Sequence, residues 1–424
     1  MNPPGGPSPA SPVPAVPESS GTDPAGSDSE PLPGARRGLV LLFASRISRG
    51  IAAGIVTVAF PYLILTDLRA GAFVLGILYA GGALATALLT YSLGRMGSRR
   101  ALRGTYLTAL ALLPVACGLL LLPASLPIVF LASIIGGFSA TGSLAGGGVG
   151  GAAFPLQSAV LSDLTPGSDR TRWFSWFTFG AGISASAGAL VAQAGSLTDL
   201  FAAALVLSAA SVLLAIPVPV RPIARGRAPS ARSRAVIYRF TATGILNGVS
   251  QGLLTPFLIP FFVVAFGVAR PEMAIYTTAG STAGTFAVLA APALDRRWGF
   301  VRSIVGTRLL SGGMALAMPF VPLAPALALY ILLPVFRVMA LPAQSAALMG
   351  NLPGADRSEG AGTNQAARVG AASGATAFSG FALEDVALSV PFLGYAAAVA
   401  ANAYLYVHFF GWRGEKIASL RASG

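Results

Sequence analysis

A stretch of 17 residues occurs twice in this chain, and the repeat limits the folds that the chain can adopt. Residues 154–170 read FPLQSAVLSDLTPGSDR, and residues 341–357 read LPAQSAALMGNLPGADR. One offset relates Pro155 to Pro342 and Arg170 to Arg357, and nine of the 17 paired positions are identical. Such a long-period repeat indicates two tandem copies of one structural unit. Both copies run from an apolar segment into a Pro-Gly-x-Asp-Arg turn, so we expect the two units to share an orientation.

The composition places the chain in a lipid bilayer. Its 424 residues are 54% hydrophobic and only 10% charged, and the mean hydropathy is +0.72. Soluble domains carry about 25% charged residues. The net charge of +13 comes from arginines at the ends of apolar segments, which is typical of membrane anchors and does not indicate nucleic-acid binding. Cys117 is the single cysteine, so an internal disulfide is excluded, and we expect no metal site and no cofactor.

Apolar runs of about 20 residues, separated by Arg, Pro or Gly clusters, predict twelve membrane-spanning helices. The predicted spans are 39–65, 72–93, 101–122, 130–161, 173–195, 198–218, 236–266, 271–293, 300–320, 325–350, 359–383 and 386–411. With the repeat, they predict an all-α membrane protein with twelve transmembrane helices in two parallel, pseudo-repeated six-helix bundles.

The same pattern predicts the domain boundaries and the orientation. We expect a disordered tail at 1–37, a first half at 38–218, a basic linker at 219–235, a second half at 236–411 and a tail at 412–424. Arginines gather in alternate loops and at both chain ends, and the opposite loops hold few. By the positive-inside rule, this places both termini in the cytoplasm and the protein in the plasma membrane.

The loops after the second span of each half carry related motifs. The first reads Gly94-Arg95-Met96-Gly97-Ser98-Arg99-Arg100, and the second begins Asp295-Arg296-Arg297. With two parallel six-helix halves and a basic linker, this arrangement resembles the major facilitator superfamily, whose loop signature is roughly Gly-x-x-x-Asp-Arg-x-Gly-Arg-Arg. Arg95, Gly97 and Arg99 match it, but Thr90 and Gly94 replace its first Gly and its Asp. In the second copy, Gly299 stands one residue later than the corresponding glycine of the signature.

The resemblance implies transport by alternating access, in which the halves rock about a site near the membrane midplane. It also implies that spans 1, 4, 7 and 10 line the cavity and that the loop motifs close its cytoplasmic side. The candidate gate residues are Arg95, Gly97, Arg99, Asp163, Asp169, Arg170, Asp295, Arg296, Asp356 and Arg357.

Polar side chains inside apolar spans are costly and are therefore candidates for substrate binding. Arg46 and Arg49 lie three apart on span 1 and can act at the cytoplasmic gate or on substrate. Arg337 lies mid-span in span 10, where a cavity role is favoured, and Gln344 follows it on the same helix face.

Three amides complete the candidate set. Asn247 and Gln251, four apart on span 7, can face the cavity or bond a neighbouring helix. Gln157 on span 4 is the repeat equivalent of Gln344. No Asp or Glu lies mid-span, so the residues identify no coupling ion, although proton coupling usually needs such a carboxylate.

These features predict a transporter and not an enzyme. No phosphate-binding loop or Cys/His cluster is present, which excludes ATP-driven transport within this chain. The leading hypothesis is a monomeric transporter of a small organic solute, with efflux favoured by what is common in the family. Carriage of organic anions by the buried arginines is the alternative. A membrane sensor or assembly protein is the alternative from another class, disfavoured because the chain shows no folded soluble domain.

Overall fold

Helices make up nearly all of the described chain, and no strand occurs among the described residues. This computed structural model describes residues 34–95, 99–139, 149, 151–153, 156–157, 160–161, 164–165, 170–220, 231–339, 341, 344, 347–348, 351–352 and 357–412. They all belong to one unit, Pro31–Gly424, and a second unit, Met1–Glu30, lies outside them.

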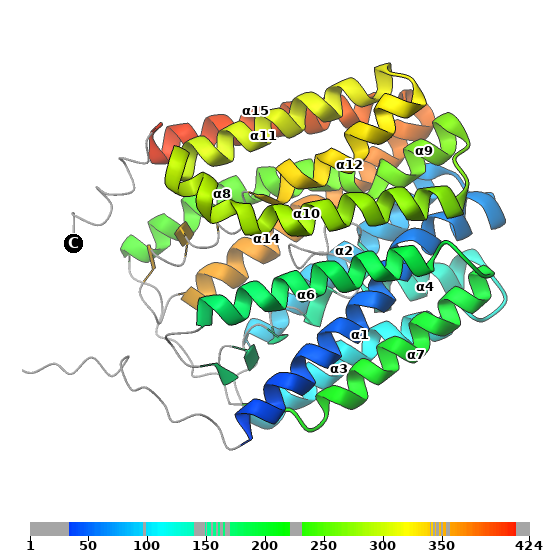
Figure 1. The fold of residues 1–424 in the computed structure, drawn as a ribbon, viewed down its shortest axis with the longest axis horizontal. Helices are drawn as coiled ribbons and strands as arrows, with labels where there is room; N and C mark the ends of the chain where they lie inside the picture. The colour runs from blue at the N-terminus through cyan, green and yellow to red at the C-terminus, as the bar shows by residue number, and fades with distance from the viewer. Residues whose placement is uncertain are drawn as a thin grey trace, which may run out of the picture. The chain divides into compact units, whose positions relative to one another are not determined.

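The first half consists of the helices α1 to α7 (Figure 1). Their bounds are α1 Ala35–Tyr62, which continues as a π-helical turn at Leu63–Asp67, α2 Ala72–Arg95, α3 Arg99–Leu119, α4 Leu126–Gly136, α6 Arg170–Val191 and α7 Leu197–Ala215. Local signals explain several of these ends. Ser196 and Asp199 form a reciprocal capping box that starts α7. Pro127 stands in the first turn of α4, where its missing N–H costs nothing.

The second half repeats this series. Its helices are α8 Ala231–Leu254, a 3₁₀ turn at Thr255–Phe257, α9 Leu258–Phe266, α10 Arg270–Trp298, α11 Phe300–Ala317, α12 Leu323–Met339, α14 Arg357–Phe381, a π-helical turn at Ala382–Val386 and α15 Val390–Phe410. The helices α8 and α9 together form the predicted seventh span. The prediction of twelve helices in two six-helix halves is confirmed. Five of the described segments are by themselves long and apolar enough to cross a membrane.

The fourth predicted span, 130–161, differs from the structure. The helix α4 begins earlier, at Leu126, because Pro127 opens the helix and does not break it. It ends at Gly136, where Gly137 adopts a left-handed conformation with φ of 59° that glycine favours. Short helical pieces follow, including a 3₁₀ turn at Gly151–Ala153. The predicted continuous helix is therefore wrong across Gly137, where the chain leaves the helical conformation.

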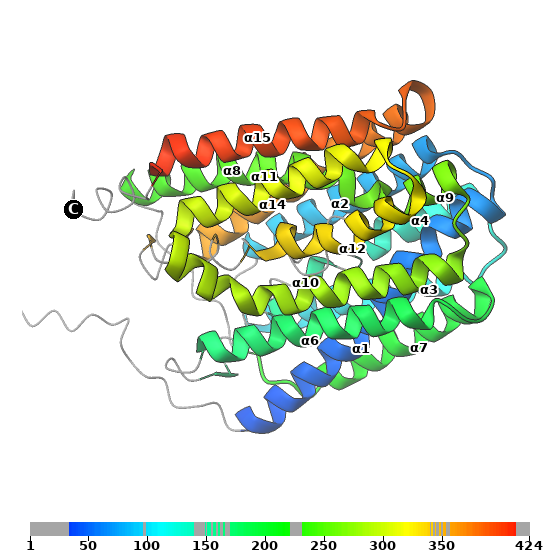
Figure 2. The same cartoon turned by 45° about the horizontal axis from the view of Figure 1, so that its top comes forward.

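The helix contacts repeat between the halves, as the sequence repeat requires. In the first half α1 packs on α6 and α7, and α3 packs on α4 and α7. In the second half α8 packs on α14 and α15, and α11 packs on α12 and α15. The main contacts between halves, α2 with α14 and α6 with α10, are each other's repeat equivalents. Figure 2 shows α6 of the first half beside α10 of the second.

Glycines allow these helices to approach each other closely. Gly244, Gly248 and Gly252 form a stripe at four-residue spacing on α8, and a Cβ at each would overlap atoms of α14. In the first half, a Cβ at Gly54 on α1 would overlap the backbone of α6 at Ala185. Small residues at helix interfaces are the usual means of close packing in lipid.

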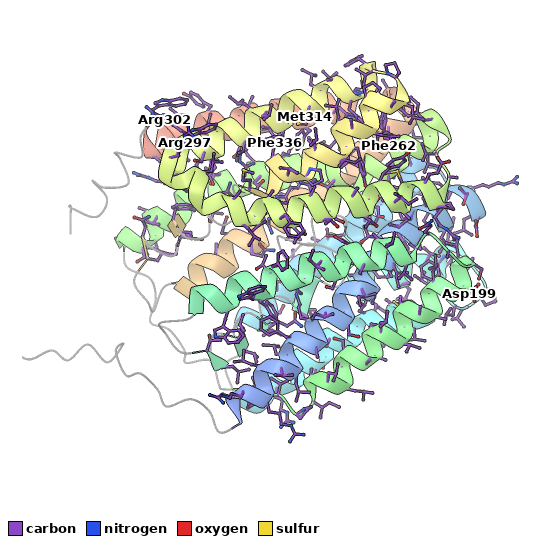
Figure 3. All side chains as sticks on the ribbon, viewed as in Figure 1. Asp199, Phe262, Arg297, Arg302, Met314 and Phe336 are labelled. Carbon is purple, nitrogen blue, oxygen red and sulfur yellow. The ribbon has the colours of Figure 1, made fainter. Side chains whose placement is uncertain are left out.

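The two ends of the bundle differ in charge. The start of α1 and the end of α15 lie at the same end in both ribbon views (Figures 1 and 2). Figure 3 places Arg297 and Arg302 at this end and Asp199 at the other. The predicted tails and linker lie mostly outside the described residues, although α1 and α8 begin at Ala35 and Ala231, earlier than their predicted spans. The domain boundaries therefore stay predictions.

We predict that Gly248→Val lowers the stability of the protein. A Cβ at Gly248 would meet the carbonyl oxygen and Cα of Arg368, which are backbone atoms that cannot turn aside. Overpacking of this kind costs about 1–3 kcal/mol. Thermal unfolding in detergent measures the change. Gly374→Val is the control, because Gly374 has nothing within 4 Å of its missing Cβ. Equal melting temperatures for the two variants would contradict the close packing.

Candidate substrate pathway and gates

Arg337 lies in the last turn of the described helix α12, which corresponds to the predicted tenth span. Its Nη1 donates to the Thr255 hydroxyl at 2.5 Å, in the 3₁₀ turn that follows α8. The phenol groups of Tyr395 and Tyr330 lie within electrostatic range of its guanidinium. Within the described residues, Arg337 contacts no carboxylate. The structure thus brings spans 7 and 10 together through one half-buried guanidinium with neutral partners.

A second guanidinium in the same half, that of Arg308, is more fully buried than that of Arg337. Arg308 on α11 is 7% exposed and donates to Asn247 Oδ1 at 3.1 Å. Gln251 Nε2 donates to the same oxygen, also at 3.1 Å. Asn247 therefore joins α8 to α11, whereas Gln251 bonds to Asn247 within α8. The Arg308 Nε atom is buried without a hydrogen-bond partner.

The arginines of span 1 bond within the first half. Arg46 Nη1 donates to Gln157 Oε1 at 3.0 Å, and its guanidinium lies 5.3 Å from the ring centre of Phe177. Arg49 is 3% exposed and donates to the Leu110 carbonyl of α3 at 3.0 Å. Arg46 thus links spans 1 and 4, whereas Arg49 joins span 1 to span 3.

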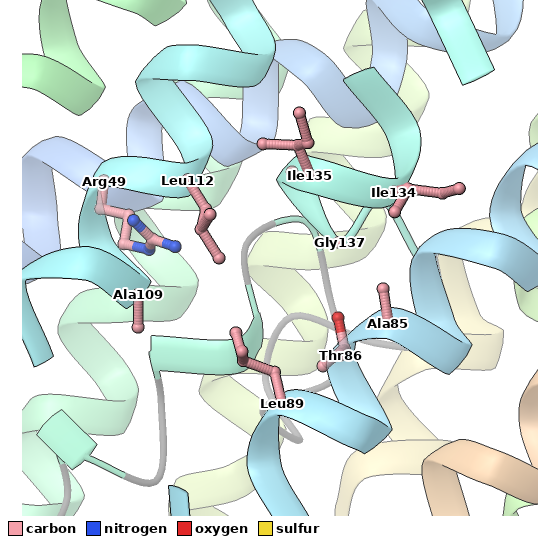
Figure 4. Close-up of a pocket in the computed structure, with 10 residues that line it drawn as sticks. Arg49, Ala85, Thr86, Leu89, Ala109, Leu112, Ile134, Ile135 and Gly137 are labelled. Carbon is pink, nitrogen blue, oxygen red and sulfur yellow. The ribbon is translucent and has the colours of Figure 1, made fainter. Parts of the chain in front are cut away.

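A cavity of about 120 Å³ lies beside Arg49 (Figure 4). Its walls come from α1, α2, α3 and the end of α4, and they are apolar apart from Arg49 and Thr86. The cavity is therefore inside the first half and involves no helix of the second. It does not coincide with the predicted midplane site between the halves.

Several predicted residues are placed only in part. Gln344 is helical and half-buried, and its Nε2 has no hydrogen-bond partner. Gly97, Asp163, Asp169 and Asp356 lie outside the described residues. Arg95, Arg99, Arg170, Asp295, Arg296 and Arg357 lie on helices, but the positions of their side chains are not described. The ion pairs predicted for the arginine-rich gate therefore stay predictions.

The opposite end of the bundle is closed by contacts between the halves. The Glu384 carboxylate accepts a 2.7 Å hydrogen bond from the backbone N–H of Phe73, in the first turn of α2. The Tyr62 hydroxyl donates to the Val268 carbonyl at 2.9 Å, and Arg270 donates to the Gly195 carbonyl. Gly76 and Gly380 let α2 and α14 touch just below.

These contacts again follow the repeat. Glu384 ends span 11 and reaches the start of span 2, while Arg270 starts span 8 and reaches the end of span 5. Deeper in the bundle, the hydroxyls of Ser186 on α6 and Ser281 on α10 are 2.8 Å apart. Glu384 and Arg270 lie just outside the predicted spans 359–383 and 271–293. The sequence does not show their partners, because backbone acceptors and donors leave no signal in it.

The fold and these contacts define a multi-pass membrane protein built from two repeated halves. A sequence model described as the Major Facilitator Superfamily matches residues 42–383. The chain belongs to this family, and it is a transporter of small solutes that works by alternating access.

Solved structures share the fold at low sequence identity. A mutant form of the nucleoside transporter NupG has a TM-score of 0.66 and 14% identity, over 90% of this chain and 99% of its own. The human organic anion transporter MFSD10 has a TM-score of 0.65 and 14% identity, over 88% and 100%. The inward open xylose transporter XylE from E. coli has 0.65 and 13%, over 90% and 98%. No match was found among curated protein sequences.

We predict that Glu384→Ala weakens closure at the Glu384 end. A cysteine pair at Phe73 and Phe381, whose ring centres are 6.3 Å apart across the halves, reports closure through a short thiol crosslinker in a Cys117→Ala background. Losing one hydrogen bond of about 0.5–1.5 kcal/mol should lower the crosslinking rate about two- to tenfold.

The neighbouring carboxylate supplies the control for this experiment. Asp385→Ala removes the same charge from the same exposed turn and should leave the rate unchanged. Glu384→Gln keeps an acceptor oxygen and should lie between Glu384→Ala and the parent protein. Equal effects of Glu384→Ala and Asp385→Ala would show that surface charge, and not the bond to Phe73, controls closure.

Proposed function

We propose that this chain carries small organic anions across the membrane and that Arg337 binds the anionic group. The supporting observation is the environment of Arg337. Arg337 falls in the middle of the predicted span 325–350, and its described hydrogen-bond partner is the neutral Thr255 hydroxyl. Placing an arginine near the centre of a membrane helix costs at least about 2.5–3.5 kcal/mol, so such residues usually serve a function.

The chemistry of Arg337 fits a carboxylate or phosphate group. A guanidinium presents its donors in a planar fork that matches the two oxygens of such a group. Arg308 adds a second positive charge to the same half, and Tyr395 lies within electrostatic range of both arginines. No described helix carries an Asp or Glu farther than one turn from its ends. The described interior therefore favours anions over cations.

The resemblance to the family supports the location of the site. Spans 1, 4, 7 and 10 line the cavity in the family, and Arg337 and Thr255 lie on spans 10 and 7. MFSD10, described as an organic anion transporter, shows that this fold can move such solutes, and its 14% identity supports nothing at the level of residues. The arginine-rich end is then cytoplasmic, with both termini there and the plasma membrane as the expected location. Efflux remains the proposed direction. Its support is only that efflux is common in the family.

We predict that Arg337→Gln weakens binding and transport of anionic solutes. Loss of a charge-assisted interaction worth about 1.5–3 kcal/mol should weaken apparent affinity about 10- to 100-fold. Arg337→Lys keeps the charge without the fork and should lose less. Uptake by the purified protein in liposomes, across aliphatic acids, aromatic acids and lipophilic cations, measures the effect. Ligand-induced changes in melting temperature report binding independently of flux.

A matched control separates local from general electrostatic effects. Arg69→Gln removes an exposed positive charge at the Glu384 end and should leave anion uptake unchanged. Selective uptake of lipophilic cations, unaffected by Arg337→Gln, would support efflux of hydrophobic compounds and refute the anion proposal. Absence of flux for every class, from protein with a normal melting temperature, would favour the sensor or assembly role.

A further inference from the structure

We propose that the corner formed by the α10–α11 turn and the end of α15 binds the headgroup of an anionic phospholipid. Arg297 ends the loop motif Asp295-Arg296-Arg297, but the residues of this site are not among the candidate substrate or gate residues. The proposal goes beyond the proposed function. It lies at the arginine-rich end of the bundle, where Figure 3 shows Arg297 and Arg302. We refer to the residues Arg297, Trp298, Arg302 and Trp412 as the corner site.

The backbone brings the two arginines of the corner site together. The helix α10 ends at Trp298 and α11 begins at Phe300, so Gly299 alone makes the turn. Its φ of 80° lies in the region that glycine adopts readily. Ser303 also bonds back to the Leu294 carbonyl of α10 at 3.2 Å. Arg297 and Arg302 therefore lie on either side of this one-residue turn, five residues apart.

Arg302 has an unfilled hydrogen-bonding position. Its Nε is buried and has no hydrogen-bond partner. Its guanidinium carbon lies 5.9 Å from the ring centre of Trp412, just beyond the end of α15. Buried polar atoms nearly always have a partner, so this Nε is a donor that no described residue satisfies. A phosphate oxygen has the charge and geometry that a guanidinium prefers.

The aromatic residues place the corner site at the membrane surface. Trp298 is 49% exposed and Trp412 is 48% exposed, and tryptophan is enriched where membrane and water meet. The Trp298 ring lies along α11, beside Gly306. A headgroup bound here would therefore contact both cations and aromatic rings.

Apolar surface next to the corner site favours a lipid over a soluble anion. Leu309 and Leu310 on α11 are 50% and 48% exposed, and Tyr404 on α15 is 67% exposed. They lie farther along the same helices, toward the middle of the membrane, where acyl chains would pack. Basic clusters at the cytoplasmic ends of membrane helices attract anionic headgroups in the same way.

Native mass spectrometry of the full chain in detergent tests the proposal. Phosphatidylglycerol should be retained more strongly than phosphatidylcholine, and glycerol phosphate without acyl chains should not compete. The double variant Arg297→Gln with Arg302→Gln should retain about tenfold less phosphatidylglycerol. The control Arg36→Gln with Arg37→Gln removes two exposed arginines from α1 at the same end and should bind like the parent protein.

A second measurement uses protein that retains both arginines, so the test stays valid if the double variant is unstable. Brominated phosphatidylglycerol should quench tryptophan fluorescence more than brominated phosphatidylcholine, and Trp412→Phe should reduce that difference. Equal retention by the two double variants, equal quenching by the two lipids, or full competition by glycerol phosphate would each overturn the proposal.

Discussion

Close contact between helix backbones is the interaction on which the rest of this structure depends. Lipid provides little hydrophobic force between membrane helices, so dispersion contacts and interhelical hydrogen bonds must hold them together. The glycine stripe of α8 against α14 and the contact of Gly54 with α6 provide those contacts within each half. Gly76 and Gly380 provide the same contact between halves. An interface without interlocking side chains can also slide, which suits two halves that must rock.

The sequence predicted the architecture because two of its signals are physically simple. An apolar run of about 20 residues has few alternatives to a membrane helix, and the repeat of residues 154–170 required matching halves. The contacts of α1 with α6 and of α8 with α14 confirm that match. The failure at Gly137 is equally physical. Hydropathy counts glycine as apolar, and it cannot register a left-handed residue that ends a helix.

The site was less predictable, because helical periodicity gives the face of a residue but not its partner. The spacing of Asn247 and Gln251 predicted that they share a face of one helix, yet nothing in the sequence showed that Arg308 would donate to Asn247. The hydroxyl of Thr255 was equally unmarked as the partner of Arg337. Partners that lie far away in the chain become visible only when the helices are placed in space.

The two halves repeat each other in backbone but not in charge. One guanidinium links the first and fourth spans of each half, through Arg46 and Gln157 in one and through Arg337 and Thr255 in the other. These arginines are not repeat equivalents, since Arg46 lies on a first span and Arg337 on a fourth. Because the halves repeat each other, the scaffold can open first at one end and then at the other. The packing energies of these two states should differ little. In the proposed function, Arg337 keeps its place on α12 during this exchange, so that one cation serves both sides of the membrane in turn.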